Sequence, residues 1–289
     1  MTSDAPEAAP FDPPAPVPCE YCGKHRHTTG FFLMGSVKWN FCGPERCDCP
    51  EAVAAYEREE AEREAKERAE REAIEAEAMR RRVREIVGDS GMNHRFLSRT
   101  FETFEQTPEN QRGYNACKRY ADTFRDKLPE NNPAPGRNGL FITGPFGTGK
   151  THLVAAIANQ LMQGGVPVVC MTMIDLLDRI KQTYEQSQQW GASESGILKL
   201  YKTVPLLVID DMGKEYVKDW GLSKIYAIIN ARYEAHLPTI ITTNYSDTAL
   251  VKRLTPRDTG DTYTAEATID RLREMCAGIV TTGDSWRSR

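Results

Sequence analysis

Short apolar runs alternate with amphipathic segments over the C-terminal two thirds of the chain. Five runs rich in Val, Ile, Leu and Thr lie at residues 139–143, 166–172, 204–210, 239–243 and 277–282. Helical patterns fill the gaps between them, most clearly at 152–163 and 222–236. Because apolar strands separated by helices build a parallel sheet covered on both faces, the pattern predicts an α/β domain at residues 91–289 with a five-stranded parallel sheet.

Residues 51–90 have a different pattern, in which Glu, Arg and Ala recur with almost no large apolar side chain. Glu precedes Arg by four residues in pairs such as Glu59 and Arg63, which is the favourable order on a helix. A coiled coil would need large apolar a and d positions, where this stretch offers mainly Ala. The pattern predicts a charged helical linker, a single solvated helix that acts as a spacer and ends near Gly88.

The first 18 residues are rich in Pro and Ala and have neither a basic start nor an apolar stretch. They are typical of a disordered tail rather than a signal peptide. No run approaches the ~20 apolar residues of a membrane span, so we expect a cytoplasmic protein with no membrane partner. The net charge, counted as Lys and Arg minus Asp and Glu, is 13 − 19 = −6 over residues 1–90. Over residues 91–289 it is 24 − 22 = +2. This balance excludes a broad basic DNA-coating surface, so any DNA contact is local.

Five of the eight cysteines lie in a 31-residue window, within residues 19–50. Clustered cysteines in a cytosolic chain indicate a metal site rather than disulfides, and four thiolates suit structural Zn²⁺. The Cys-x-x-Cys pair of Cys19 and Cys22 forms one half of such a site. For the second half the spacing allows Cys47 with Cys49, or Cys42 with Cys47, and His25 or His27 could replace a thiolate.

The strongest motif is GPFGTGKT, which matches G-x-x-x-x-G-K-[ST] between a predicted strand and a predicted helix. Glycines allow backbone N–H groups to surround phosphates, Lys150 brings charge to the β- and γ-phosphates, and the Thr151 hydroxyl can bind Mg²⁺. The motif predicts an ATP site with its cofactor-binding residues at Gly144, Pro145, Phe146, Gly147, Thr148, Gly149, Lys150, Thr151 and His152.

Two further strands end in polar residues that suit the same site. LLVIDDMG places Asp210 and Asp211 at the carboxyl end of a strand, where ligands of parallel sheets bind. We expect Asp210 to bind Mg²⁺ and Asp211 to orient or activate the attacking water. TIITTNY ends the next strand at Asn244, whose side chain would reach the γ-phosphate or the water.

In these motifs and their order, the chain resembles the DnaC/DnaI-type helicase loaders of bacteria and phages and their relative IstB. The resemblance covers about residues 95–289: RFLSRTFETF ahead of the P-loop, then the acidic strand, IYAIINARYE, TTNY, IDRLREM and DSWRSR. It implies an AAA+ core that self-associates with ATP bound between neighbours. Arg271 matches the arginine finger, which would reach the γ-phosphate of the adjacent subunit.

The resemblance has departures. Ala267 stands where some family members carry a further Arg, and the chain stops shortly after the final strand without the AAA+ helical lid, as DnaC/DnaI-type proteins also do. Arg287 matches a family Arg to which we assign no role. RCDCP resembles N-terminal zinc modules of phage loader-like proteins, which favours Cys19, Cys22, Cys47 and Cys49 as the ligands.

The resemblance implies as partners a replicative helicase, the DnaB-type hexamer, and single-stranded DNA. In the family the region between the second strand and the acidic strand touches DNA. Here it offers Arg179, Lys181, Lys199 and Lys202 for phosphates, and Tyr184 and Trp190 for stacking on bases. The zinc module would bind the helicase while residues 91–289 use ATP and DNA.

Four functions compete. The first is a helicase loader, and the second is an IstB-like transposition ATPase with the same core. The third, a small-molecule P-loop kinase, fits poorly with the Asp-Asp strand and Asn244. The fourth is a nearly inactive ATP-binding adaptor, because Asp211 stands where many AAA+ proteins have the longer Glu.

Overall fold

The computed structural model describes residues 13–33, 36–39, 44–88, 97–132, 136–185, 194–260 and 262–286. The chain forms two compact units, Met1–Ala73 and Ile74–Arg289. The long helix α1 (Pro50–Val87) contributes residues to both. No helix in the described ranges combines the length and the apolar character that crossing a membrane requires.

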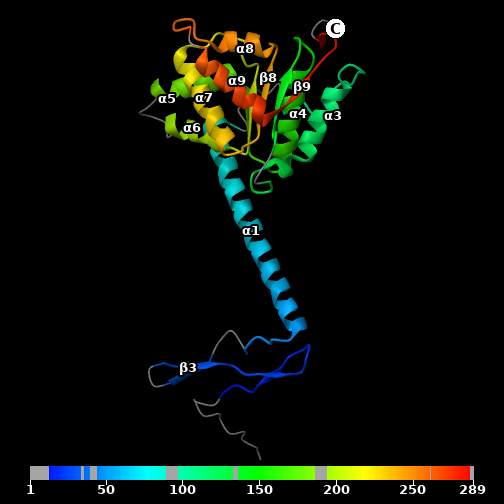
Figure 1. Ribbon diagram of the computed structural model, residues 1–289, viewed down its shortest axis with the longest axis vertical. Coiled ribbons are helices and arrows are strands. Elements are labelled where there is room, and N and C mark those ends of the chain that lie inside the picture. The colour runs from blue at the N-terminus through cyan, green and yellow to red at the C-terminus, as the bar shows by residue number, and fades with distance from the viewer. Residues whose placement is uncertain are drawn as a thin grey trace, which may run out of the picture. The chain divides into compact units, whose positions relative to one another are not determined.

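A five-stranded parallel sheet forms the centre of the second unit (Figure 1). Its strands are β5 (Gly139–Thr143), β6 (Val168–Thr172), β7 (Leu206–Asp210), β8 (Thr239–Thr243) and β9 (Cys276–Val280). They lie in the order β6-β7-β8-β5-β9, and every neighbouring pair is parallel. The predicted fold class is confirmed. Because β7, β8 and β5 are neighbours, their carboxyl ends meet at one edge of the sheet.

Two strands begin two residues later than the apolar runs predicted. The backbone N–H of Val166 donates to Leu161 O, and that of Val204 donates to Leu200 O. Both residues therefore complete the hydrogen bonding of a preceding helix end, and Pro205, which has no N–H, separates Val204 from β7.

Helices cover both faces of the sheet (Figure 1). One face carries α3 (Gln111–Asp122) and α4 (Lys150–Gln163), and the other carries α5 (Met173–Glu185), α6 (Glu194–Thr203), α7 (Asp219–Glu234), α8 (Asp247–Leu254) and α9 (Tyr263–Met275). Alternate residues of β6 point to opposite cores, with Val168 and Cys170 in one and Val169 and Met171 in the other. A strand buried on both faces reads as a continuous apolar run, which is why the sequence pattern locates it.

Helix α1 confirms the predicted charged helix, but the expectation of a helix solvated along its whole length is wrong. Val83 is buried in the core that α5, α6 and α7 share, and Met79 and Ile86 pack against that core. Arg82 donates to Gly196 O, and Arg179 donates to Ile86 O. These three apolar positions follow the i, i+4, i+7 spacing of one helix face, and they bind the last turns of α1 to the other helices of the second unit.

The described part of the first unit before α1 contains short strands. Two short antiparallel pairs join β1 (Val17–Pro18) to β2 (His25–Arg26) and β3 (Gly30–Leu33) to β4 (Ser36–Trp39). Its described core consists of Cys19, Cys47 and Ala52, with Cys49 and Tyr56 packed against them. A bound metal is a source of stability that small units commonly use.

Candidate functional site

The loop between β5 and α4 has backbone geometry that favours glycine. Gly144, Gly147 and Gly149 have φ angles of 149°, 80° and 89°, where other residues are strained. Gly149 stands directly before the first turn of α4, whose N-terminal N–H groups and dipole favour an anion. The sequence motif therefore adopts the geometry of a phosphate-binding loop.

Lys150 lies inside this loop. Its side chain is buried, and its Nζ donates to the carbonyl oxygens of Gly144 at 2.8 Å and Pro145 at 2.7 Å. An ammonium group so placed brings a full positive charge to the loop that would receive the phosphates.

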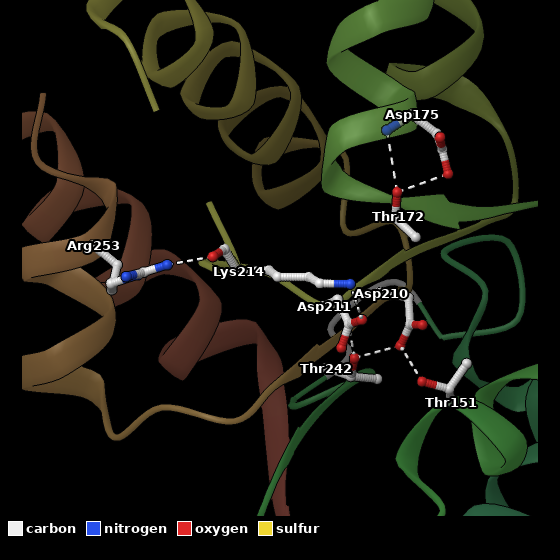
Figure 2. Close-up of polar contacts among 8 residues, drawn as sticks. All are labelled: Thr151, Thr172, Asp175, Asp210, Asp211, Lys214, Thr242 and Arg253. Carbon is white, nitrogen blue, oxygen red and sulfur yellow. Dashed lines mark hydrogen bonds and ion pairs between the residues drawn. The ribbon is translucent and has the colours of Figure 1, made fainter. Parts of the chain in front are cut away.

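Asp210 ends β7 beside the first turn of α4, and Figure 2 shows the contacts of its carboxylate. Its Oδ1 accepts hydrogen bonds from Thr151 Oγ1 at 3.3 Å and from Thr242 Oγ1 at 2.5 Å. Burial raises the pKa of Asp210 above its usual range, and the Thr242 bond opposes that shift. A buried carboxylate next to the Thr151 hydroxyl supplies the hard oxygen ligands that Mg²⁺ prefers.

Asp211 has a different environment although it is the next residue. Its φ of 55° turns the chain sharply after the strand, and its backbone N–H donates to Thr242 Oγ1 at 2.9 Å. Its side chain is 24% exposed, with Oδ2 3.7 Å from Lys214 Nζ (Figure 2). A partly solvated carboxylate beside a buried one suits contact with a water molecule.

Asn244 follows β8, the strand between β5 and β7. It lines a cavity of about 400 Å³ together with Thr143, Gly144, Pro145, Tyr245, Ser246 and Asp247. The structure therefore brings Asn244 next to the P-loop, as its position in the sequence predicted.

Two predicted cofactor-binding residues have other surroundings: His152 lies in the first turn of α4, and Phe146 lies within the phosphate loop. The His152 ring contacts Thr100 O through Nε2 at 2.9 Å and packs edge-on against Phe104, with ring centroids 5.1 Å apart. It thus fastens the segment ahead of the P-loop to α4, and burial lowers the pKa of its imidazole. Phe146 is exposed. Their predicted part in cofactor binding stays a prediction.

Arg271 lies on α9, whereas Asp210 and Asp211 of the same chain lie at the end of β7. Its Nε donates to Asn230 Oδ1 at 2.7 Å, and its guanidinium lies 4.9 Å from the centre of the Tyr226 ring. Its assignment as an arginine finger concerns a neighbouring subunit and stays a prediction.

Four cysteines of the first unit converge. The Sγ atoms of Cys19, Cys22, Cys47 and Cys49 all lie within 4.8 Å of one another. Cys19 Sγ is 3.9 Å from Cys49 Sγ, and Cys22 Sγ is 3.4 Å from Cys47 Sγ. Tetrahedral zinc with ~2.3 Å bonds separates its sulfur ligands by about 3.8 Å, so the cluster has the size of a Cys₄ zinc site.

The pKa values of the thiols in this cluster are shifted in opposite directions. Backbone N–H groups of Cys22 and Tyr21 lower the pKa of Cys19 to about 7, whereas burial raises the pKa of Cys49 to about 12. Neither His25 nor His27 belongs to this group of potential ligands among the described residues. Cys42 lies outside the described residues.

The predicted DNA-contacting side chains are placed only in part. Arg179 is engaged with Ile86 O, and Lys181 Nζ lies 3.7 Å from Asp178 and 5.7 Å from the centre of the Trp220 ring. The side chains of Tyr184 and Trp190, and the whole of Arg287, lie outside what the structure describes.

Thr242 and Thr281 are site residues that the sequence motifs did not reveal. Thr242 contacts both acids, and Thr281 contacts the P-loop through Thr148 Oγ1 at 2.7 Å. The available signal was a polar residue inside or directly after an apolar strand, which is too common to single out a position by itself.

The parallel sheet, the P-loop ahead of α4 and the acids that end β7 define a P-loop ATP-binding protein of the AAA+ class. The chain belongs to the family of IstB-like ATP binding proteins, whose family model matches residues 134–289.

The similarity to individual proteins covers more of the chain than the family model does. The replicative helicase loader DnaC of Escherichia coli (strain K12) is 27% identical over 210 residues, which cover 72% of this chain and 77% of that protein. The phage-like element PBSX protein XkdC of Bacillus subtilis (strain 168) is 27% identical over 206 residues, 68% of this chain and 69% of that protein. The crystal structure of the DnaC helicase loader has a similar fold, with a TM-score of 0.53 at 24% identity, covering 66% of this chain and all of the other.

Proposed function

We propose that this protein is an ATP-dependent loader of a replicative DNA helicase. It would place a DnaB-type hexamer on single-stranded DNA and hydrolyse ATP as a switch. The observation that carries the proposal is the similarity to a replicative helicase loader over 72% of this chain. The relative from a phage-like element supports a phage origin for the chain.

The residues of the ATP site have separate roles in this proposal. Backbone N–H groups of Gly144 and of residues 146–149 and the Lys150 ammonium would bind the phosphates, while Thr151 and Asp210 would hold Mg²⁺. Asp211 orients the attacking water, and Asn244 contacts the γ-phosphate or that water. When bound, Mg²⁺ would neutralise charge on the phosphates, and these residues would hold the ion in place.

Self-association completes the site. Arg271 would contribute its guanidinium to the ATP of an adjacent subunit, where a cation stabilises the charge of phosphoryl transfer. Replacing Arg271 with Ala should leave ATP binding intact and lower hydrolysis by about 10³-fold or more. Equal loss of binding and hydrolysis would assign Arg271 to the structure of its own subunit.

The cysteine cluster is the proposed partner arm. Cys19, Cys22, Cys47 and Cys49 would bind one Zn²⁺, which folds the segment at residues 19–50 and presents it to the helicase. The small described core of this unit supports a metal with a structural role.

The mass of the complex with the replicative helicase of the same genome, measured by native mass spectrometry with ATP and with ADP, tests the loader function. We expect a zinc-dependent complex of fixed stoichiometry that changes with the nucleotide. Lys150→Ala should abolish nucleotide binding and the nucleotide response, and retained tight binding would contradict the assigned pocket.

Other outcomes select another function. No complex with the helicase under either nucleotide, together with binding to a transposase from a neighbouring gene, would favour the IstB-like ATPase. Phosphorylation of a metabolite would favour a kinase. Binding without turnover at saturating ATP would favour the adaptor.

A further inference from the structure

The segment that follows β9 contacts the P-loop from the side of β9, opposite β8 and β7. Thr281 continues the β9–β5 pairing by donating its backbone N–H to Thr143 O at 2.7 Å. Trp286 donates its backbone N–H to Gly147 O at 3.1 Å. The two ends of the segment 281–286 therefore contact the residue before the P-loop and the middle of the loop itself.

The contact is close enough to require glycine in the loop. A Cβ on Gly144 would collide with the backbone oxygen of Thr281. A Cβ on Gly147 would collide with Ser285. Two of the motif's glycines are thus needed for the approach of the C-terminal segment as well as for their positive φ.

The side chains of Thr281 and Thr148 form a buried pair within this contact. Each is 1% exposed, and their Oγ1 atoms are 2.7 Å apart. Thr281 Oγ1 also lies 3.1 Å from Thr143 O, and Thr148 Oγ1 lies 3.0 Å from Pro145 O. The two hydroxyls have two protons for three contacts: the one between them, the one to Thr143 O and the one to Pro145 O. When one hydroxyl donates to the other, the remaining proton can bond to only one of the two carbonyls.

The position of Lys150 affects whether the remaining proton bonds to Pro145 O or to Thr143 O. Its Nζ donates to Pro145 O at 2.7 Å, the same carbonyl that Thr148 can use. When Lys150 turns toward a phosphate, Pro145 O depends on the Thr148 hydroxyl, and Thr281 must then donate to Thr148. The position of the P-loop lysine and the hydrogen bonding of the C-terminal segment are therefore coupled.

We propose that Thr281 is a positioning residue of the nucleotide site, through which the segment 281–286 sets the P-loop for a nucleoside triphosphate and responds to its binding. The proposal rests on the proposed ATP-dependent function and adds a residue that touches the P-loop from the side away from the catalytic acids. Thr282 provides a matched comparison, because its Oγ1 donates to Glu109 O at 2.8 Å instead of to the loop.

The experiment compares Thr281→Val, Thr281→Ser and Thr282→Val in the full chain. Affinities for ATP and ADP are measured by calorimetry, and melting temperatures are measured without nucleotide. Thr281→Val should bind ATP about tenfold more weakly, with a smaller change for ADP, because Lys150 acts on the β- and γ-phosphates. Thr281→Ser should restore the affinity, and Thr282→Val should match the unaltered protein.

Equal ATP affinities for Thr281→Val and Thr282→Val would overturn the proposal and leave the ATP site itself intact. If the unaltered protein bound neither nucleotide, the proposed function would fail together with the inference. Should Thr281→Val not fold, amide hydrogen exchange of the unaltered chain decides: slower exchange at Thr281 and Trp286 with ATP supports the coupling, and unchanged exchange overturns it.

Discussion

The hydroxyl of Thr242 donates to Asp210 Oδ1 at 2.5 Å, across the pairing of β8 with β7, and both side chains are buried. The same oxygen of Thr242 accepts the backbone N–H of Asp211 at 2.9 Å. One threonine thereby joins the two acids that the sequence predicts for Mg²⁺ binding and water activation.

Replacing Thr242 with Val keeps the shape and removes both bonds. We expect Mg²⁺-dependent ATP hydrolysis to fall about tenfold, because Asp210 loses a donor to its charged form and Asp211 loses the anchor of its backbone. A titration of hydrolysis against Mg²⁺ should show a higher half-saturating concentration. Thr203→Val, at an exposed helix end, is the control, and identical Mg²⁺ curves for both variants would contradict this role.

The raised pKa of Asp210 predicts a pH-dependent stability. A carboxyl whose pKa is higher in the folded than in the unfolded state binds more protons when folded, so its contribution falls as pH rises from about 4 through the folded pKa. Asp210→Asn should therefore melt a few degrees higher than the unaltered protein at pH 7 without nucleotide, and the difference should shrink toward pH 4. Calorimetric melting curves across this range check the sign. A lower melting temperature for the variant at pH 7 would mean that its hydrogen bonds outweigh the burial of charge.

Arg232 is fully buried on α7 and binds backbone carbonyls instead of a carboxylate. Its guanidinium donates to Tyr201 O, Val204 O and Pro238 O at 2.9, 2.8 and 2.6 Å, and burial lowers its pKa to about 9. Arg232→Ala leaves several buried carbonyls without donors, so the free energy of unfolding should fall by ~3–5 kcal/mol. Chemical denaturation measures this loss. Arg112→Ala on the exposed side of α3 should change it by less than ~0.5 kcal/mol.

The cysteine cluster predicts one zinc ion per chain. Cys22→Ser should lower the zinc content measured by elemental analysis, whereas Cys117→Ala, at a buried cysteine of the second unit, should keep it. A strong chelator should abolish helicase binding and leave ATP binding by the second unit unchanged. Loss of zinc in a Cys42→Ser variant would instead assign Cys42 as a ligand.

The sequence alone determined the parts of this protein that depend on local pattern. Strands buried on both faces appear as apolar runs, so five strands and the covering helices could be predicted from residues 139–282. The P-loop was predictable because its glycines, Lys150 and Thr151 act within one short segment. The Glu–Arg spacing of α1 likewise specified a helix.

Only the tertiary structure decided which residues meet across the sheet order β6-β7-β8-β5-β9. Thr242 meets Asp210 because β8 pairs with β7, and Thr281 meets Thr148 because β9 pairs with β5. Val83 is buried because the end of α1 packs against helices far along the chain. Hydrogen bonds and burial depend on distances in space, and a residue's neighbours in sequence carry little information about partners more than 30 positions away.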